Sequence, residues 1–312
     1  MRVIIITGMR YRIIGAVAAM AVVAAGLPVP LPVSAAPAKI VAVGAENEYA
    51  DVIAQIGGRY VAVTAVMSNP NTDPHTFESS PKVAAAVSAA DLVVQNGLGY
   101  DTFMTKIEQA APSRRRHVVD VQHLLGLPDS TPNPHLWYKP TTMPAVAKAV
   151  GADLAVLLPA DRAYFRSKVA AFVASLQPWY RAIRALKAAH PGAAVATTEP
   201  VADYLLQAAG LDNVTPFTFQ ADIMNGVDPS PQDVSFQQDL FTGHKVRAFV
   251  YNQQVTDPLT QSLLQLAHQN HIPVVGVYET MPTPGYHYQS WMLAEVHALS
   301  AALGPGRSSP KL

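Results

Sequence analysis

The stretch KIVAVGAENEYADVIAQIGGRYVAVTAVM, residues 39–67, decides the fold class of this chain. It opens with a β-branched run over 39–43, continues with a helical pattern over 47–56 that stops at the glycine pair 57–58, and closes with a second β-rich run over 60–67. A strand, a helix and a strand in this order form a crossover unit whose two strands run parallel. The stretch therefore predicts an α/β protein built on a parallel sheet.

The same alternation continues through the rest of the chain. Further strands are expected at 91–95, 117–121, 193–197, 214–219, 246–251 and 272–278, and further helices at 81–90, 142–158, 201–209, 231–241, 258–270 and 288–303. A helical stretch over 161–189 is too long for an ordinary crossover, and Pro178 should kink or interrupt it. We therefore expect two α/β lobes, each a parallel sheet flanked by helices, joined by a long rigid helix, with a site in the cleft between them. The expected parts are a signal peptide (1–35), an N-terminal lobe (36–159), a connecting helix (160–190) and a C-terminal lobe (191–312).

The first 35 residues have the pattern of a secretory signal peptide. Three arginines precede an apolar run over 13–27, which at about 15 residues is short for a membrane span. Val33-Ser34-Ala35 then fits the small-x-small cleavage rule and places the mature start near Ala36. A retained membrane anchor is the alternative. We expect cleavage and export to the periplasm, with secretion outward as the other destination.

Composition narrows the classes of function. The chain has 312 residues and a formal net charge of zero, which argues against nucleic acid as the main partner. It contains no cysteine. Disulfides, cysteine-based zinc sites, thiol nucleophiles and a lipidated cysteine after the signal peptide are therefore excluded for this sequence.

Two tripeptides, Asp73-Pro74-His75 and Asn133-Pro134-His135, are the clearest chemical signal. Proline fixes its own φ and keeps the residue before it out of helical space. Each histidine is therefore expected on a stiff, non-helical loop that aims its imidazole at a fixed point. Two such loops suggest two ligands converging on one metal ion.

Two glutamates directly follow strands in the second half of the chain. Glu199 follows the strand 193–197, and Glu279 follows the strand 272–278. Taken singly, a post-proline histidine is more often a surface residue, Glu199 could cap a helix, and Glu279 could be solvated. Four metal-competent residues at loops beside strand ends, two from each lobe, instead indicate a metal site in the cleft. Glu46, at the end of the first strand, is a candidate auxiliary ligand.

Several segments resemble the cluster A-I solute-binding proteins of ABC importers for zinc, manganese or iron, over essentially the whole mature chain. They are DPHTFE (73–78), DLVVQNG (91–97), NPHLWY (133–138), TTEPVADYL (197–205) and VYETMP (277–282). The resemblance implies that His75, His135, Glu199 and Glu279 bind one divalent ion. It also implies a soluble periplasmic protein that passes the ion to a permease in the inner membrane and catalyses no reaction. We expect it to act as a monomer.

Departures from the family pattern bear on the metal. Zinc importers of this family commonly have a third histidine where Glu199 stands here, and many carry a His-rich acidic loop that this chain lacks. Carboxylates can bind through one or both oxygens, and oxygen-rich sites suit Mn²⁺. The Irving–Williams order nevertheless favours Zn²⁺ unless geometry forbids it. We expect Mn²⁺ or Zn²⁺, with a lean towards Mn²⁺ and with Fe²⁺ as a further option.

Two other classes of function compete with this interpretation. A metal-dependent hydrolase would need an open coordination position and a general base, for which Glu46 is the only candidate, and the chain has no HExxH motif. An organic-solute receptor would need aromatic or arginine clamps in the cleft, and these are sparse. Hydrolase assays and the metal content of the native protein would separate the three classes.

Overall fold

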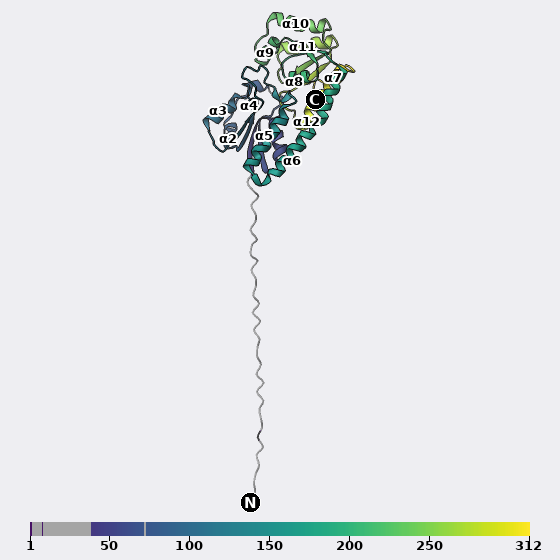
Figure 1. Ribbon diagram of the computed structural model, residues 1–312. Coiled ribbons are helices and arrows are strands. Elements are labelled where there is room, and N and C mark those ends of the chain that lie inside the picture. Colours follow the sequence, from purple (N-terminus) through teal and green to yellow (C-terminus); the bar gives the residue numbers. More distant parts are fainter. Residues whose placement is uncertain (2–7, 9–38, 72) are drawn as a thin grey trace. The chain divides into compact units, whose positions relative to one another are not determined.

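The computed structural model describes residues 1, 8, 39–71 and 73–312 (Figure 1). The expected signal peptide over 1–35 therefore lies outside the described residues, except for Met1 and Gly8. The described residues from Lys39 to Leu312 belong to one compact unit. No helix within the described ranges is long and apolar enough to cross a membrane.

Two four-stranded parallel sheets form the framework. The first has the order β2-β1-β3-β4 and the second the order β6-β5-β7-β8, so both follow the same pattern in chain order. The strands are β1 (Ile40–Glu46), β2 (Val61–Met67), β3 (Leu92–Gln95), β4 (His117–Asp120), β5 (Ala194–Thr197), β6 (Asp212–Asn213), β7 (Ala248–Asn252) and β8 (Val274–Val277). In each sheet the strand order reverses at the first strand, which places a ligand-binding edge at the carboxyl ends. The predicted fold class is confirmed.

Helices flank both sheets (Figure 1). Those of the first half are α1 (Asn47–Gly57), α2 (Pro81–Ala89), α3 (Thr102–Ala110), α4 (Val121–Leu124) and α5 (Thr142–Leu157). Those of the second half are α8 (Asp203–Ala208), α9 (Phe217–Met224), α10 (Pro231–Thr242), α11 (Pro258–Gln269) and α12 (Tyr288–Leu303). Short 3-10 turns cover Gly58–Tyr60, Pro74–Thr76, Leu136–Tyr138 and Pro159–Asp161.

The expected connecting helix is two helices. α6 covers Arg162–Ser175 and α7 covers Gln177–Ala189, with the break at Leu176. Pro178 lies in the first turn of α7, where its missing N–H has no helical partner to lose. The predicted interruption by this proline is therefore confirmed. α6 packs along α5, and α7 packs along α12.

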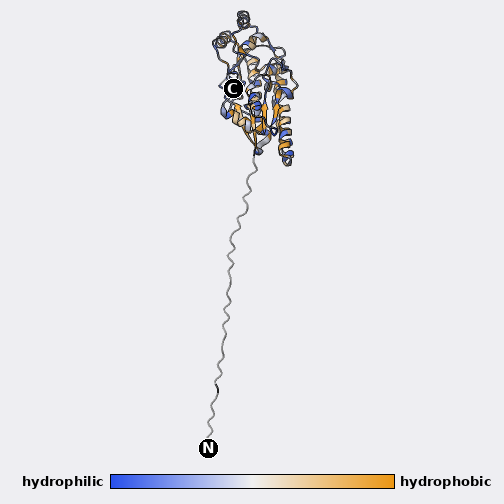
Figure 2. Ribbon diagram, turned by 90° about the vertical axis from the view of Figure 1, so that its left-hand side faces the viewer, coloured by the Kyte–Doolittle hydropathy of each residue, from blue (hydrophilic) through white to orange (hydrophobic). Residues whose placement is uncertain are grey.

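One hydrophobic core is shared by both sheets. The same cluster contains Val94 of β3 and Val250 of β7. Between the sheets, Tyr138 packs edge-on against Trp291 of α12, with ring centroids 5.7 Å apart. Figure 2 shows the apolar colouring concentrated on the strands and the helices packed against them. Because close-packed cores resist deformation, large hinge bending between the lobes would be costly. The division into lobes at 159–160 and 190–191 stays a prediction.

The prediction of a strand over 214–219 is wrong. The strand β6 ends at Asn213, and α9 begins at Phe217. The aromatic and β-branched residues in this stretch favour a strand. However, Pro216 cannot donate a ladder hydrogen bond, and it stands at the N-cap of α9. The chain therefore turns into a helix here.

Candidate metal site

The two histidines of the first lobe are held by the same local device. The Asp73 carboxylate accepts the backbone N–H of His75 at 2.8 Å, and the Asn133 side-chain oxygen accepts that of His135 at 2.9 Å. Each contact closes a small turn over the intervening proline. The prediction of a non-helical loop is wrong for His75, which lies inside a 3-10 helix because Pro74 occupies its first position, where proline is tolerated. His135 stands just before the next 3-10 helix.

His135 is fixed in one tautomer. Its Nδ1 lies 2.8 Å from the Asn133 side-chain oxygen, while the Asn133 amide nitrogen donates to the Pro200 carbonyl at 2.7 Å. The asparagine oxygen must therefore face the histidine, and Nδ1 carries the proton. Burial lowers the pKa of His135, and the contact with Glu279 opposes this effect. With Nδ1 engaged by Asn133, Nε2 is the ring nitrogen that faces Glu279.

Glu279 contacts three side chains of the first lobe. Its Oε2 lies 3.1 Å from Nε2 of both His75 and His135, and it accepts the Tyr100 hydroxyl at 2.9 Å. Burial raises the pKa of Glu279, but the contacts with His135 and His75 outweigh this effect and hold the pKa well below its usual range. Burial likewise lowers the pKa of His75, but the contact with Glu279 outweighs it and the pKa is raised.

These three residues form a cluster suited to a cation. Ligand atoms of His75, His135 and Glu279 all lie within 4.8 Å of one another. The lone pair of His135 Nε2 faces a carboxylate oxygen, and two such acceptors are stable side by side only with positive charge between them. A proton or a metal ion can supply that charge. Imidazole nitrogen and carboxylate oxygen are common ligands of Zn²⁺, and the residues present fit such an ion.

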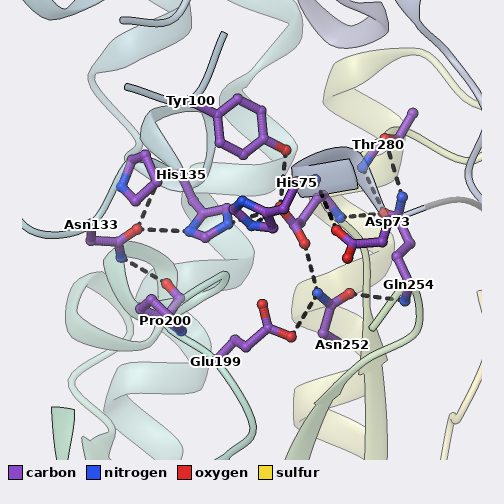
Figure 3. Close-up of polar contacts among 12 residues, drawn as sticks. Asp73, His75, Tyr100, Asn133, His135, Glu199, Pro200, Asn252, Gln254 and Thr280 are labelled. Carbon is purple, nitrogen blue, oxygen red and sulfur yellow. Dashed lines mark hydrogen bonds and ion pairs between the residues drawn. The ribbon is translucent and has the colours of Figure 1, made fainter. Parts of the chain in front are cut away.

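Glu199 lies beside this cluster rather than inside it. Its Oε1 accepts the Asn252 amide at 3.0 Å, and the same amide nitrogen donates to Glu279 Oε1 at 2.7 Å (Figure 3). Its Oε2 is buried and has no hydrogen-bond partner among the described residues. Burial raises the pKa of Glu199 well above its usual value, and repulsion from Glu279 adds to the effect. Glu199 therefore has one oxygen that Asn252 does not engage.

Glu46 is not part of the cluster found among the described residues. It is the last residue of β1 and is buried. Burial raises its pKa well above the usual value, with repulsion from Asp101 and Glu48 as further causes. The geometry gives the expected auxiliary role of Glu46 no support.

Sequence reasoning missed three polar residues of the site. The role of Asn133 could have been inferred from the tripeptide, because an asparagine side chain can accept the backbone N–H two residues later. Asn252 ends β7 at the ligand-binding edge, so the rule that found Glu199 and Glu279 could also have found it. Tyr100 lies before α3, in a stretch for which the sequence predicted no element, and no signal marked it.

The fold and the site together define a class. The protein has two lobes with matching parallel sheets and a shared core, and a histidine–carboxylate cluster lies at the strand ends. This arrangement is that of a binding protein that holds its ligand between two lobes. Residues 43–302 match the family described as the periplasmic component A of the zinc-uptake complex, and the chain belongs to this family. The predicted family is thereby confirmed.

Individual relatives are distant. The manganese-binding lipoprotein MntA of Bacillus subtilis is 22% identical over 248 residues, 74% of this chain and 76% of its own. A protein of Thermotoga maritima to which metal binding has been ascribed is 25% identical over 170 residues, which span 54% of this chain and 61% of that relative. The periplasmic zinc-binding protein TroA of Treponema pallidum superposes with a TM-score of 0.72 at 19% identity, covering 86% of this chain and 100% of TroA. At this identity the superposition supports the fold alone.

Family membership makes this chain a metal-binding solute-binding protein of the ABC-transport type, from a family that acts outside the cytoplasm. The names of the relatives point to zinc in one case and manganese in another. The metal of this chain must therefore be argued from its own site.

Proposed function

We propose that this protein captures one divalent metal ion through His75, His135, Glu199 and Glu279 and delivers it to the permease of an ABC importer. The observation that carries the proposal is the convergence of the Nε2 atoms of His75 and His135 on one oxygen of Glu279, each at 3.1 Å. Two carboxylates balance the charge of a divalent ion. The ion is cargo, and no bond is made or broken.

The rest of the proposal concerns where the protein works. We infer that residues 1–35 direct export and are removed, and that the mature protein works in the periplasm as a monomer without a lipid anchor. The absence of cysteine from the sequence supports the last point, in contrast to the lipoprotein MntA. A hydrolase is disfavoured because the four proposed ligands fill a tetrahedral site and leave no position for a catalytic water.

Titration of the metal-free protein tests the ligand set. Isothermal calorimetry with Zn²⁺ and with Mn²⁺ should give one ion per chain. His75→Ala and Glu199→Ala should weaken binding by orders of magnitude while the circular dichroism of the metal-free protein stays unchanged. His117→Ala is the matched control, because His117 pairs with Asp153 at 2.8 Å, outside the cluster. Unchanged affinity and stoichiometry in both ligand variants would overturn the assignment.

A further inference from the structure

We infer that Asn252 determines the metal preference of the site, because it restricts Glu199 and Glu279 to one ligand oxygen each. The site is then four-coordinate, with two imidazole nitrogens and two carboxylate oxygens, and it prefers Zn²⁺ to Mn²⁺. This inference rests on the proposed function and specifies its cargo.

The Asn252 side chain bridges the two carboxylates of the second lobe. Its amide nitrogen donates to Oε1 of Glu279 at 2.7 Å and to Oε1 of Glu199 at 3.0 Å. An amide nitrogen has two protons, and both are used here. One oxygen of each carboxylate is therefore committed to the same neutral group.

The orientation of Asn252 is fixed by the backbone. Its side-chain oxygen accepts the backbone N–H of Gln254 at 3.0 Å, so the amide cannot be turned to present oxygen to the carboxylates. The residue ends β7 and is 1% exposed. The bridge is thus part of the rigid sheet edge rather than of a mobile loop.

The other oxygen of each carboxylate is not engaged by Asn252. Oε2 of Glu279 faces both imidazoles, and Oε2 of Glu199 is buried without a hydrogen-bond partner among the described residues. If either carboxylate bound through both oxygens, its Oε1 would have to divide its lone pairs between the ion and the Asn252 N–H, or turn away from Asn252 and leave a buried N–H unpaired.

The ligand count decides between the two metals. Two nitrogens and two single oxygens make the tetrahedral set that Zn²⁺ prefers. Mn²⁺ prefers more oxygen ligands in an octahedral arrangement, which this chain could supply only if the carboxylates bound through both oxygens. The preference for Mn²⁺ expected from the sequence assumed that the carboxylates can bind through both oxygens. The contacts of Asn252 oppose that binding mode.

The visible absorption of bound Co²⁺ reports the coordination number of the metal ion in the unmodified protein. Four-coordinate Co²⁺ absorbs strongly in the visible range, whereas five- and six-coordinate Co²⁺ absorbs weakly. We expect the strong spectrum from the metal-free protein loaded with one equivalent of Co²⁺. A weak spectrum would overturn the inference and leave the proposed function standing. Failure to bind Co²⁺, Zn²⁺ or Mn²⁺ would overturn the proposed function itself.

Removal of the bridge tests Asn252 directly. Asn252→Ala should lower the ratio of Zn²⁺ affinity to Mn²⁺ affinity at least tenfold, about 1.4 kcal/mol. It should also weaken the cobalt spectrum, as freed carboxylate oxygens join the ion. Asn213→Ala is the control, because Asn213 donates to the Asp203 carboxylate at 2.8 Å in the same lobe, outside the proposed ligand set. An unchanged ratio and spectrum in Asn252→Ala would contradict the inference. If that variant does not fold, the spectrum of the unmodified protein decides.

Discussion

The two lobes share one strand order and contribute different chemistry to the site. The first lobe supplies imidazoles from proline-containing turns, His75 after β2 and His135 before α5. The second lobe supplies carboxylates close to its strand ends, Glu199 after β5 and Glu279 after β8. Two anions in one buried place repel each other, and Asn252 offsets that repulsion with its two N–H groups. The first lobe therefore holds its imidazoles in turns, and the second lobe holds its carboxylates with an amide bridge.

His75 differs from the other three proposed ligands in exposure. The His75 side chain keeps 24% of its surface exposed, while His135, Glu199 and Glu279 are buried. An ion can therefore enter the site from the side on which His75 lies. The buried residues are held by their neighbours before any ion arrives.

The largest effect on metal affinity is expected from removal of the buried imidazole. His135→Ala removes the one ligand whose tautomer is fixed, so affinity for Zn²⁺ should fall by more than about 100-fold, beyond the effect of losing a supporting partner. His75→Ala should cost less, because water can enter at its exposed side. Competition with a metal-binding dye measures both. Equal losses would break the distinction between the buried and the open histidine.

A second variant alters the chemistry of the other lobe. Glu199→His replaces a carboxylate with an imidazole and should raise the preference for Zn²⁺ over Mn²⁺ about tenfold, since imidazole suits zinc and carboxylate suits manganese. Glu199→Gln is the control that removes the charge without adding a nitrogen ligand. Competition titrations measure the ratio. A ratio that does not change in Glu199→His would count against the ligand-type argument.

A smaller effect is expected at the brace between the lobes. The Tyr138 hydroxyl donates to the Tyr278 carbonyl at 2.8 Å and so ties the turn after His135 to the residue before Glu279. Tyr138→Phe should reduce Zn²⁺ affinity about tenfold, as loss of a supporting partner does. Tyr180→Phe is the control, because the Tyr180 hydroxyl donates to the Pro140 carbonyl at 3.0 Å, outside the proposed ligand set. An equal loss of metal affinity in both variants would refute the bracing role.

The smallest effect on metal binding, but a clear one on stability, is expected at Glu295 of α12. Its side chain accepts Trp291 Nε1 at 3.0 Å and lies 3.2 Å from the Tyr138 hydroxyl oxygen, and burial raises its pKa to about 8. Between its unfolded pKa near about 4.3 and its folded pKa, the folded state keeps a proton that the unfolded state has lost. The free energy of unfolding should therefore fall as pH rises through this window, by about 1 kcal/mol per unit.

Glu295→Gln tests this dependence, since glutamine cannot ionise. Urea unfolding at about pH 5 and about pH 8 should show a flatter pH dependence in the variant than in the unmodified protein, with little change in metal affinity. The same slope in both proteins would show that Glu295 does not titrate in this range.

The parts of the molecule that the sequence predicted are those with a local cause. Strand–helix alternation predicted the sheets, and the prolines before His75 and His135 predicted stiff loops at these histidines. The parts that it missed depend on distant contacts. Tyr100 meets Glu279 across 179 positions in sequence, and no local pattern encodes that pairing. Asn252 acts on Glu279 across 27 positions, and its role appears only once both strand ends are side by side.

Glu199 shows where the prediction is incomplete. Its position after a strand predicted that it reaches the site, but the structure places Asn252 between it and Glu279. Strand-end position predicts which edge a side chain occupies. It does not predict which of its oxygens another side chain has already engaged.

Anomalous diffraction at the zinc edge, from crystals of the Zn²⁺-loaded protein, tests most directly whether both lobes hold one ion through four atoms. We expect a single peak bound by Nε2 of His75 and His135 and by Oε2 of Glu199 and Glu279, at about 2.0–2.2 Å from each. An ion held by other residues, or by the histidines without both carboxylates, would contradict this expectation.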